Sequence, residues 1–115
     1  MGVVTDLKAQ AARLGIKAPT APTLKRYGLT EEEWLGLLAD QGWKCPICLR
    51  RAATWNTDHH HEAGWRHMPP EQRRRYVRGV LCAYCNHRVV HSRMPADVAQ
   101  RIADYIAAYE RRRDA

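Results

Sequence analysis

The chain has 115 residues, and its 19 lysine and arginine residues against 12 acidic ones give a formal charge of +7. This length predicts one small domain, or a domain with a tail, and the excess of arginine favours a polyanionic partner such as nucleic acid. The sequence lacks the run of about 20 apolar residues that spans a bilayer, and its N-terminus lacks the features of a signal peptide. We therefore expect a cytoplasmic protein with no membrane partner, whose paired cysteines bind metal rather than form disulfides.

The N-terminal residues predict a short helix followed by a linker. Residues 5–14 have a helical pattern, with Thr5 as the N-cap and Gly15 as the stop. Residues 16–23 are rich in proline and threonine, which is typical of a linker. We therefore assign residues 1–23 to an N-terminal arm that packs weakly or not at all.

A second helix is predicted after Thr30, which forms a capping box with Glu33. Gly42 is expected to end this helix. Its buried stripe should consist of three large side chains, those of Trp34, Leu35 and Leu38.

The middle of the chain predicts strands separated by a loop. Thr54–Thr57 favours a strand, which we expect to form a β-hairpin through a turn at Arg50–Ala52. Residues 62–76 contain glycine, proline and several arginines, which is typical of an exposed loop. A further short strand is expected at 77–82, and the chain should become helical from Asn86.

The longest helical pattern lies near the C-terminus, in residues 94–113, with Pro95 at the first helical position. We assign residues 93–115 to a C-terminal helix. Its apolar face is expected to contain Val98, Ile102, Tyr105, Ile106 and Tyr109.

Two Cys-x2-Cys pairs, CPIC and CAYC, are separated by 33 residues. Four thiolates suit one tetrahedral structural zinc ion, which contributes roughly 10–16 kcal/mol to the folding of small domains. A closed site of this kind has no open coordination position and should do no chemistry. The alternative is that histidines enter the zinc shell and cysteines stay free.

The stretch TDHHHEAG offers four adjacent polar side chains. Alternation along a strand places His59 and His61 on one face, with Asp58 and His60 on the other. A bend at the strand end could bring Asp58 beside His59. The Asp58 carboxylate and the Asn86 amide oxygen suit Mg²⁺ or Mn²⁺, and a histidine can accept a proton from water near neutral pH. His60 faces away and is assigned no catalytic role.

The ordered motifs GLTEEEWLGLLADQGWKCPIC, TDHHHEAG and VRGVLCAYCN resemble the phage recombination endonuclease VII family, within the HNH (ββα-metal) nucleases, over residues 24–92. The resemblance implies an α+β fold, a small ββα-metal (His-Me finger) domain between N- and C-terminal helices. It implies that Asp58 and Asn86 hold the catalytic divalent cation. It also implies that His59 is the general base and that His61 contacts the scissile phosphate. The implied structural zinc has four ligands, Cys45, Cys48, Cys82 and Cys85.

The sequence departs from the family pattern at two points. Val89 stands where some junction-resolving members have a glutamate, so His87 or His91 is a candidate to complete the metal shell. Residues 65–76 form an insertion in a loop that is usually short, and one helix replaces the long dimerisation region. Both features argue against specificity for branched junctions.

We therefore predict a metal-dependent HNH endonuclease that nicks DNA or cuts both strands with low sequence specificity. The alternative is a non-catalytic, zinc-dependent nucleic-acid-binding module. DNA is the expected partner, and a second copy of the chain or a phage or host DNA-processing protein is a further candidate. The chain is expected to be phage-encoded or bacterial and intracellular. Four arginines are predicted to contact DNA, namely Arg73, Arg74, Arg75 and Arg78.

Overall fold

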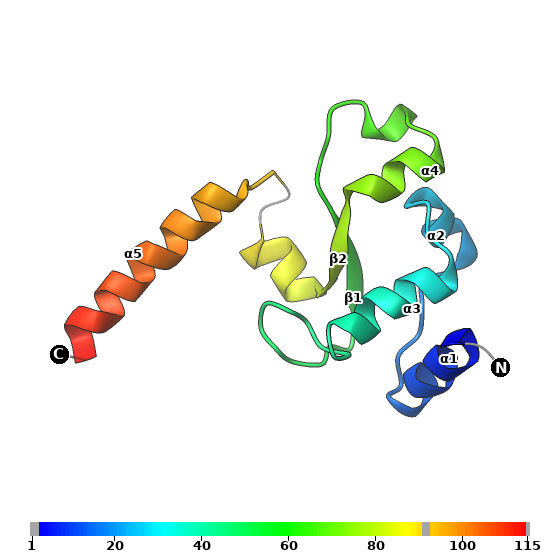
Figure 1. Cartoon of the computed structure of the whole chain (residues 1–115), viewed down its shortest axis with the longest axis horizontal. Helices are drawn as coiled ribbons and strands as arrows, with labels where there is room; N and C mark the ends of the chain where they lie inside the picture. The colour runs from blue at the N-terminus through cyan, green and yellow to red at the C-terminus, as the bar shows by residue number, and fades with distance from the viewer. Residues whose placement is uncertain (1–2, 91–92, 115) are drawn as a thin grey trace.

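The computed structural model describes residues 3–90 and 93–114. In chain order its elements are α1 (Val3–Arg13), α2 (Ala21–Arg26), α3 (Glu31–Asp40), β1 (Trp55–His59), the 3-10 helix η1 (Trp65–His67), α4 (Pro70–Arg73), the 3-10 helix η2 (Arg74–Tyr76), β2 (Val77–Cys82), the π-helix η3 (Cys85–Val89) and α5 (Ala96–Asp114). Figure 1 shows α1, α2 and α3 on one side of the two strands, with α5 extending away on the other. The predicted α+β class is confirmed. Within 3–90 and 93–114, no helix is both long and apolar enough to cross a membrane.

Helix α1 is packed into the body of the protein. The helix already begins at Val3, so Thr5 lies inside it and is not its N-cap. As predicted, the chain leaves the helix at Gly15, whose φ of 70° suits glycine. Ala11 and Ile16 are buried at 3% and 9% exposure in the main core. This packing differs from the weakly packed arm expected before residue 24, and α2 runs across that boundary.

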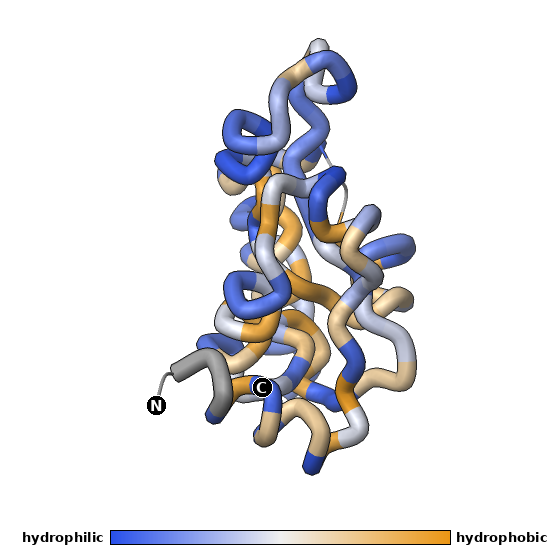
Figure 2. Tube along the Cα trace, turned by 90° about the vertical axis from the view of Figure 1, so that its right-hand side faces the viewer, coloured by the Kyte–Doolittle hydropathy of each residue, from blue (hydrophilic) through white to orange (hydrophobic). Residues whose placement is uncertain are grey.

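Helix α3 supplies the centre of the core. The capping box of Thr30 and Glu33 is present, and Gly42 (φ 73°) follows the helix end, both as predicted. Figure 2 shows hydrophobic positions concentrated along the inner segments, whereas the upper end of the molecule is largely hydrophilic. The predicted buried stripe is confirmed, and the core cluster contains Ala11, Ile16, Leu24, Trp34, Leu35, Leu38 and Val80.

The partner of β1 is β2, and the two strands are antiparallel. The predicted local hairpin is therefore wrong, because residues 50–52 form an irregular loop and the strands are separated by the insertion. Asp58 pairs with Gly79 but His59 pairs with Val77. This shift leaves Arg78 as an extra residue in β2, which is a β-bulge.

Residues 62–76 were expected to form an exposed loop, and none of them is buried, but the insertion is folded and not irregular. It forms η1, α4 and η2. Its anchor is Arg73, whose guanidinium donates hydrogen bonds to three backbone carbonyls, those of Met68 (2.9 Å), Arg26 (3.0 Å) and Arg66 (2.9 Å). Gly28 at the end of α2 lies so close to Pro70 that a Cβ atom there would collide with the Pro70 carbonyl. The insertion is therefore packed against α2.

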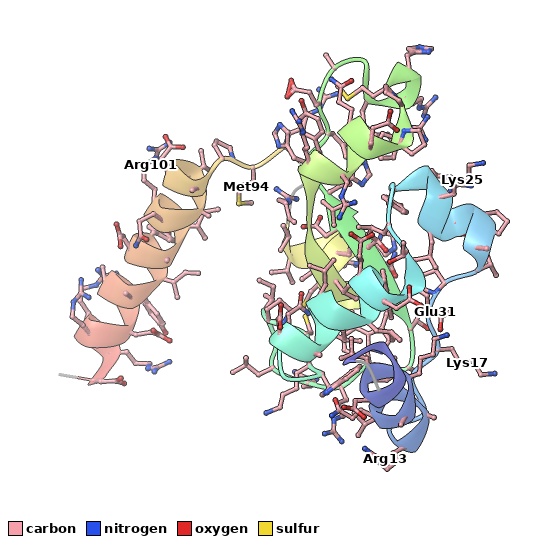
Figure 3. All side chains as sticks on the ribbon, turned by 45° about the vertical axis from the view of Figure 1, so that its right-hand side comes forward. Arg13, Lys17, Lys25, Glu31, Met94 and Arg101 are labelled. Atoms are coloured by element: carbon pink, nitrogen blue, oxygen red, sulfur yellow. The ribbon has the colours of Figure 1, made fainter. Side chains whose placement is uncertain are left out.

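Helix α5 begins at Ala96, so Pro95 precedes the first helical position. No residue of its described part is buried. Figure 3 shows this helix, with Arg101 on it, standing apart from the rest of the protein. The predicted apolar face is present but exposed, as at Ile102, Tyr105, Ile106 and Tyr109.

Candidate metal centre and catalytic cleft

The two cysteine pairs meet in one cluster, which we call the four-cysteine cluster (Cys45, Cys48, Cys82 and Cys85). The four Sγ atoms lie within 4.8 Å of one another, and Sγ of Cys48 is 3.8 Å from that of Cys82. A tetrahedral zinc site with Zn–S bonds of about 2.3 Å has sulfur–sulfur edges of about 3.8 Å. The four-cysteine cluster could therefore hold zinc. Among the residues described, it includes no histidine, so the alternative of a mixed zinc shell does not match the structure.

The thiols of this cluster differ in acidity. Burial raises the pKa of Cys45, but hydrogen bonds from the backbone of Cys48, Cys82 and Ile47 outweigh it and lower the pKa to about 6. Burial, together with hydrogen bonds from the other cysteines, raises the pKa of Cys85 to about 12. A thiolate thus forms readily at Cys45, while ionisation of Cys85 needs a compensating positive charge. A bound dication supplies that charge.

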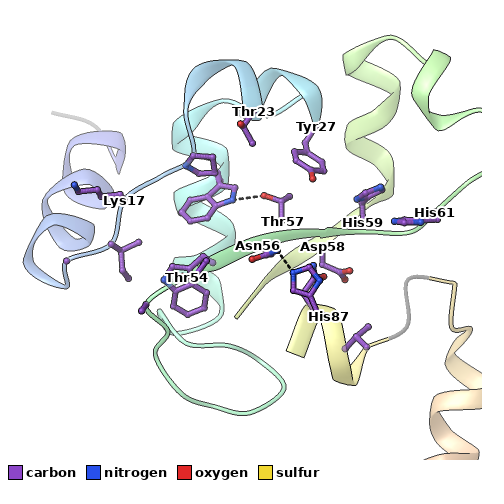
Figure 4. Close-up of a pocket in the computed structure, with 18 residues that line it drawn as sticks. Lys17, Thr23, Tyr27, Thr54, Asn56, Thr57, Asp58, His59, His61 and His87 are labelled. Carbon is purple, nitrogen blue, oxygen red and sulfur yellow. Dashed lines mark hydrogen bonds between the residues drawn. The ribbon is translucent and has the colours of Figure 1, made fainter. Parts of the chain in front are cut away.

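A cleft of about 800 Å³ runs along β1. Its walls come from the segment after α1, from β1 and from η3. Figure 4 shows Thr57 and His59 on one side of the strand, with Asn56 and Asp58 on the other, as strand alternation predicts. The cleft brings together predicted site residues that are distant in sequence, namely Asp58, His59, His61, Asn86 and His87.

Asp58 is the one charged residue buried in the described core, at 6% exposure. Nε of Arg78 donates to Oδ2 of Asp58 at 2.8 Å, and Nη2 donates to Oδ1 at 3.0 Å. The bulge at Arg78 makes this pairing possible by placing an extra residue opposite Asp58. Each carboxylate oxygen has a second lone pair, so Asp58 can still bind a cation from the cleft.

Asn86 reaches the cleft from the first turn of η3. The preceding residue, Cys85, is 1% exposed and belongs to the four-cysteine cluster. A zinc ion bound there would therefore fix the start of η3 and, with it, the position of Asn86. Nearby in the cleft, Nδ2 of Asn56 lies 3.3 Å from Nε2 of His87.

His59 lies among aromatic rings at the end of β1. Its ring stacks on His61 and on Trp65, with centroid distances of 4.6 and 4.3 Å. The ring of Tyr27 meets it edge to face, with a centroid distance of 5.4 Å. Burial lowers the pKa of His59, and the neighbouring His61 lowers it further against the opposing effect of Asp58. The imidazole is therefore neutral near pH 7 and can accept a proton.

The other histidines occupy different surroundings. Nε2 of His60 lies 3.8 Å from Glu62, its ring faces Tyr76, and it lines neither of the cavities next to His59. His87 borders the cleft. The other candidate ligand, His91, lies outside the residues that the structure describes.

The four arginines predicted to contact DNA have different partners. Arg73 is bound to backbone carbonyls, Arg74 pairs with Glu33, and Arg78 pairs with Asp58. Arg75 is exposed. A second cavity of about 750 Å³ adjoins His59 and is lined by the insertion. The aromatic neighbours Tyr27 and Trp65 were not predicted as site residues.

The fold and the site define a small ββα protein in which a four-cysteine cluster supports a cleft with Asp, His and Asn side chains. The chain belongs to the recombination endonuclease VII family, whose sequence model matches residues 21–108, which confirms the resemblance in the motifs. It is also 32% identical over 87 residues to the Gene 59 protein of Mycobacterium phage D29. That match covers 72% of this chain and 46% of the phage protein, so the chain spans about half the length of this relative. No solved structure matches the chain.

Proposed function

We propose that the protein is a divalent-metal-dependent HNH endonuclease that hydrolyses phosphodiester bonds in DNA. The observation that carries this proposal is the cleft that holds Asp58, His59 and Asn86 together. A binding module needs none of these three side chains in one cleft. Membership of an endonuclease family supports DNA as the substrate.

In this proposal Asp58 and Asn86 would hold the catalytic cation through hard oxygen donors, which suit Mg²⁺ or Mn²⁺. When bound, the ion would stabilise the negative charge that develops on the leaving oxygen. Arg78 orients the Asp58 carboxylate through both of its oxygens. These two hydrogen bonds keep the Asp58 carboxylate in a fixed orientation before a cation binds.

His59 acts as the general base. Its lowered pKa leaves the imidazole neutral at physiological pH, so it can take the proton of the attacking water. His61 contacts the scissile phosphate in this proposal, and its exposed position beside the ring of His59 supports that role.

DNA binding rests on the positive charge of the chain and on exposed cations of the insertion. Arg75 and Arg66 are exposed on the insertion. The other three arginines already have intramolecular partners, so only their remaining N–H groups can donate to DNA; these are Arg73, Arg74 and Arg78. Each phosphate contact should steepen the salt dependence of binding. In the same proposal the four-cysteine cluster binds a structural zinc ion that takes no part in the reaction.

The test is nicking of supercoiled plasmid with Mg²⁺ or Mn²⁺, compared between wild type and His59→Ala. Loss of a general base typically costs about 10²- to 10⁴-fold in rate, so we expect at least a 100-fold loss without a change in thermal unfolding. His60→Ala is the matched control, because His60 lies in the same segment but outside the cleft. Robust nicking by His59→Ala would refute the base assignment.

A parallel panel of linear duplex, single-stranded and branched DNA identifies the preferred substrate. If wild-type protein binds DNA with a steep salt dependence but shows no cleavage that depends on a divalent ion, the non-catalytic binding module is the correct description. Such a result would contradict the endonuclease proposal.

A further inference from the structure

His59 is held in place by ring contacts. Among the residues that the structure describes, neither ring nitrogen of His59 has a hydrogen-bond partner, although its ring stacks on two neighbours. A catalytic histidine is commonly oriented by a hydrogen bond from its second nitrogen to a carboxylate or carbonyl. The orientation of the His59 ring must therefore come from packing.

The closest of these contacts comes from Trp65 in the insertion. The indole ring lies nearly parallel to the imidazole, with an interplanar angle of 22° and a centroid distance of 4.3 Å. Tyr27, at the end of α2, contacts both rings, with its centroid 5.4 Å from His59 and 5.8 Å from Trp65. His59 is thus enclosed by aromatic side chains from two segments outside its own strand.

Trp65 is itself fixed by Arg73. The guanidinium carbon of Arg73 lies 5.2 Å from the centroid of the Trp65 ring, a distance at which a cation attracts the face of an indole. Three backbone carbonyls accept hydrogen bonds from the same guanidinium. One of them belongs to Arg26 of α2, so Arg73 links the insertion to the helix next to Tyr27.

The placement of Trp65 carries an energetic penalty. Its indole N–H is buried and has no acceptor among the described residues, and a buried donor without a partner is destabilising. A leucine would fill apolar space at this position without burying a donor, so filling space does not account for the tryptophan. The flat indole does two things that a leucine could not do: it offers a ring face to the Arg73 guanidinium, and it stacks on the ring of His59.

We propose that Trp65, held by Arg73, is a positioning residue that fixes the imidazole ring of His59 for proton transfer. This inference rests on the proposed function, because it assigns the insertion a role at the same site. Trp65 contacts neither the substrate nor the reacting atoms in this scheme and acts only through His59.

The decisive measurement separates kcat from KM for plasmid nicking. Misplacement of a reacting group by about 1 Å can lower a rate by about 100-fold, so Trp65→Ala and Trp65→Leu should lower kcat by about 10- to 100-fold with little change in KM. Trp65→Leu fills the space but has no flat ring, whereas Trp65→Phe restores one and should recover most of kcat. Gln72→Ala is the control within α4 and should behave as wild type.

NMR of the His59 ring protons tests the positioning without any need for activity. Stacking on an indole shifts these protons, and the shift should be present in wild type and Gln72→Ala, smaller in Trp65→Phe and absent in Trp65→Leu. Wild-type kcat in Trp65→Leu, a change confined to KM, or unshifted His59 protons in wild type would each overturn the inference. An inactive wild type with shifted protons would instead refute the endonuclease proposal and leave the positioning of His59 confirmed.

Discussion

Removal of the Arg78 guanidinium should destabilise the protein and make its stability depend on divalent cations. Asp58 is 6% exposed, and both of its oxygens accept hydrogen bonds from Arg78. Breaking a buried ion pair on one side typically costs about 3–5 kcal/mol. The Arg78 side chain is 30% exposed and Asp58 borders the open cleft. We therefore expect a smaller loss for Arg78→Ala, about 2–3 kcal/mol.

This loss is large enough to measure by thermal unfolding. With an unfolding entropy of roughly 2.1 cal/mol/K per residue, it corresponds to a decrease in Tm of about 8–12 °C. The assay is circular dichroism in buffer with and without millimolar Mn²⁺. Mn²⁺ should recover much of the lost Tm in Arg78→Ala, because the proposed ion at Asp58 replaces the missing positive charge and binds only the folded protein.

A double variant separates this effect from general destabilisation. Arg78→Ala combined with Asp58→Asn has no buried charge without a partner, so it should unfold at a higher temperature than Arg78→Ala alone and respond less to Mn²⁺. The reasoning would be refuted by a loss under about 0.5 kcal/mol in Arg78→Ala. Equal stabilisation of the single and double variants by Mn²⁺ would refute the role of Asp58 as a cation ligand.

Three further predictions concern the framework of the fold. Removing the proposed zinc ion with a chelator should abolish the helical circular dichroism, because structural zinc contributes roughly 10–16 kcal/mol, which is comparable to the net stability of a small domain. A folded metal-free sample would contradict this. In urea unfolding, Leu38→Ala should lower the free energy of unfolding by about 2–5 kcal/mol. Ile106 is 48% exposed, so Ile106→Ala should lower it by less than about 1 kcal/mol. Equal losses in the two variants would contradict the exposed position of α5. Gly28→Ala should lower the free energy of unfolding by more than about 2 kcal/mol, because φ of Gly28 is 72° and the new Cβ would collide with Pro70. A Tm of Gly28→Ala equal to that of wild type would contradict this prediction.

The parts of the fold that the sequence predicts correctly depend on contacts within a few residues. Thr30 and Glu33 are three positions apart and form the predicted capping box. Gly42 follows the end of α3 because its positive φ is accessible to glycine at little cost. The four-cysteine cluster is an exception, because its two Cys-x2-Cys pairs are separated by 33 residues. It could be predicted because four thiolates suit one tetrahedral zinc ion, which relates the two pairs by chemistry and not by distance along the chain.

The incorrect predictions depend on contacts that are distant in sequence. The partner of β1 is β2, which follows the insertion in the chain. The residue pattern of a strand does not indicate which other strand it pairs with. Residues 62–76 have the composition of a loop, yet they fold because Arg73 binds backbone carbonyls, and any residue type can supply these. The apolar face of α5 has a buried pattern, but no residue in the described part of this helix is buried.

The candidate site combines both kinds of information. Strand alternation separates His59 from Asp58, and the cysteine pair before Asn86 indicates how that residue is fixed. The sequence predicts a DNA contact for Arg78 and does not predict its pairing with Asp58. That pairing depends on a β-bulge, which no sequence pattern indicates here.

Each proposed site residue is thus held by a different part of the structure. A zinc ion in the four-cysteine cluster would fix the start of η3 and hence Asn86, and the bulge in β2 brings Arg78 to Asp58. The insertion brings Trp65 to the ring of His59. Because Asp58 and His59 point to opposite sides of β1 (Figure 4), the proposed cation ligand and the proposed base are supported from opposite directions. A two-stranded sheet is too small to fix both side chains by its own packing, so the cluster and the insertion provide the rigidity that the proposed reaction needs.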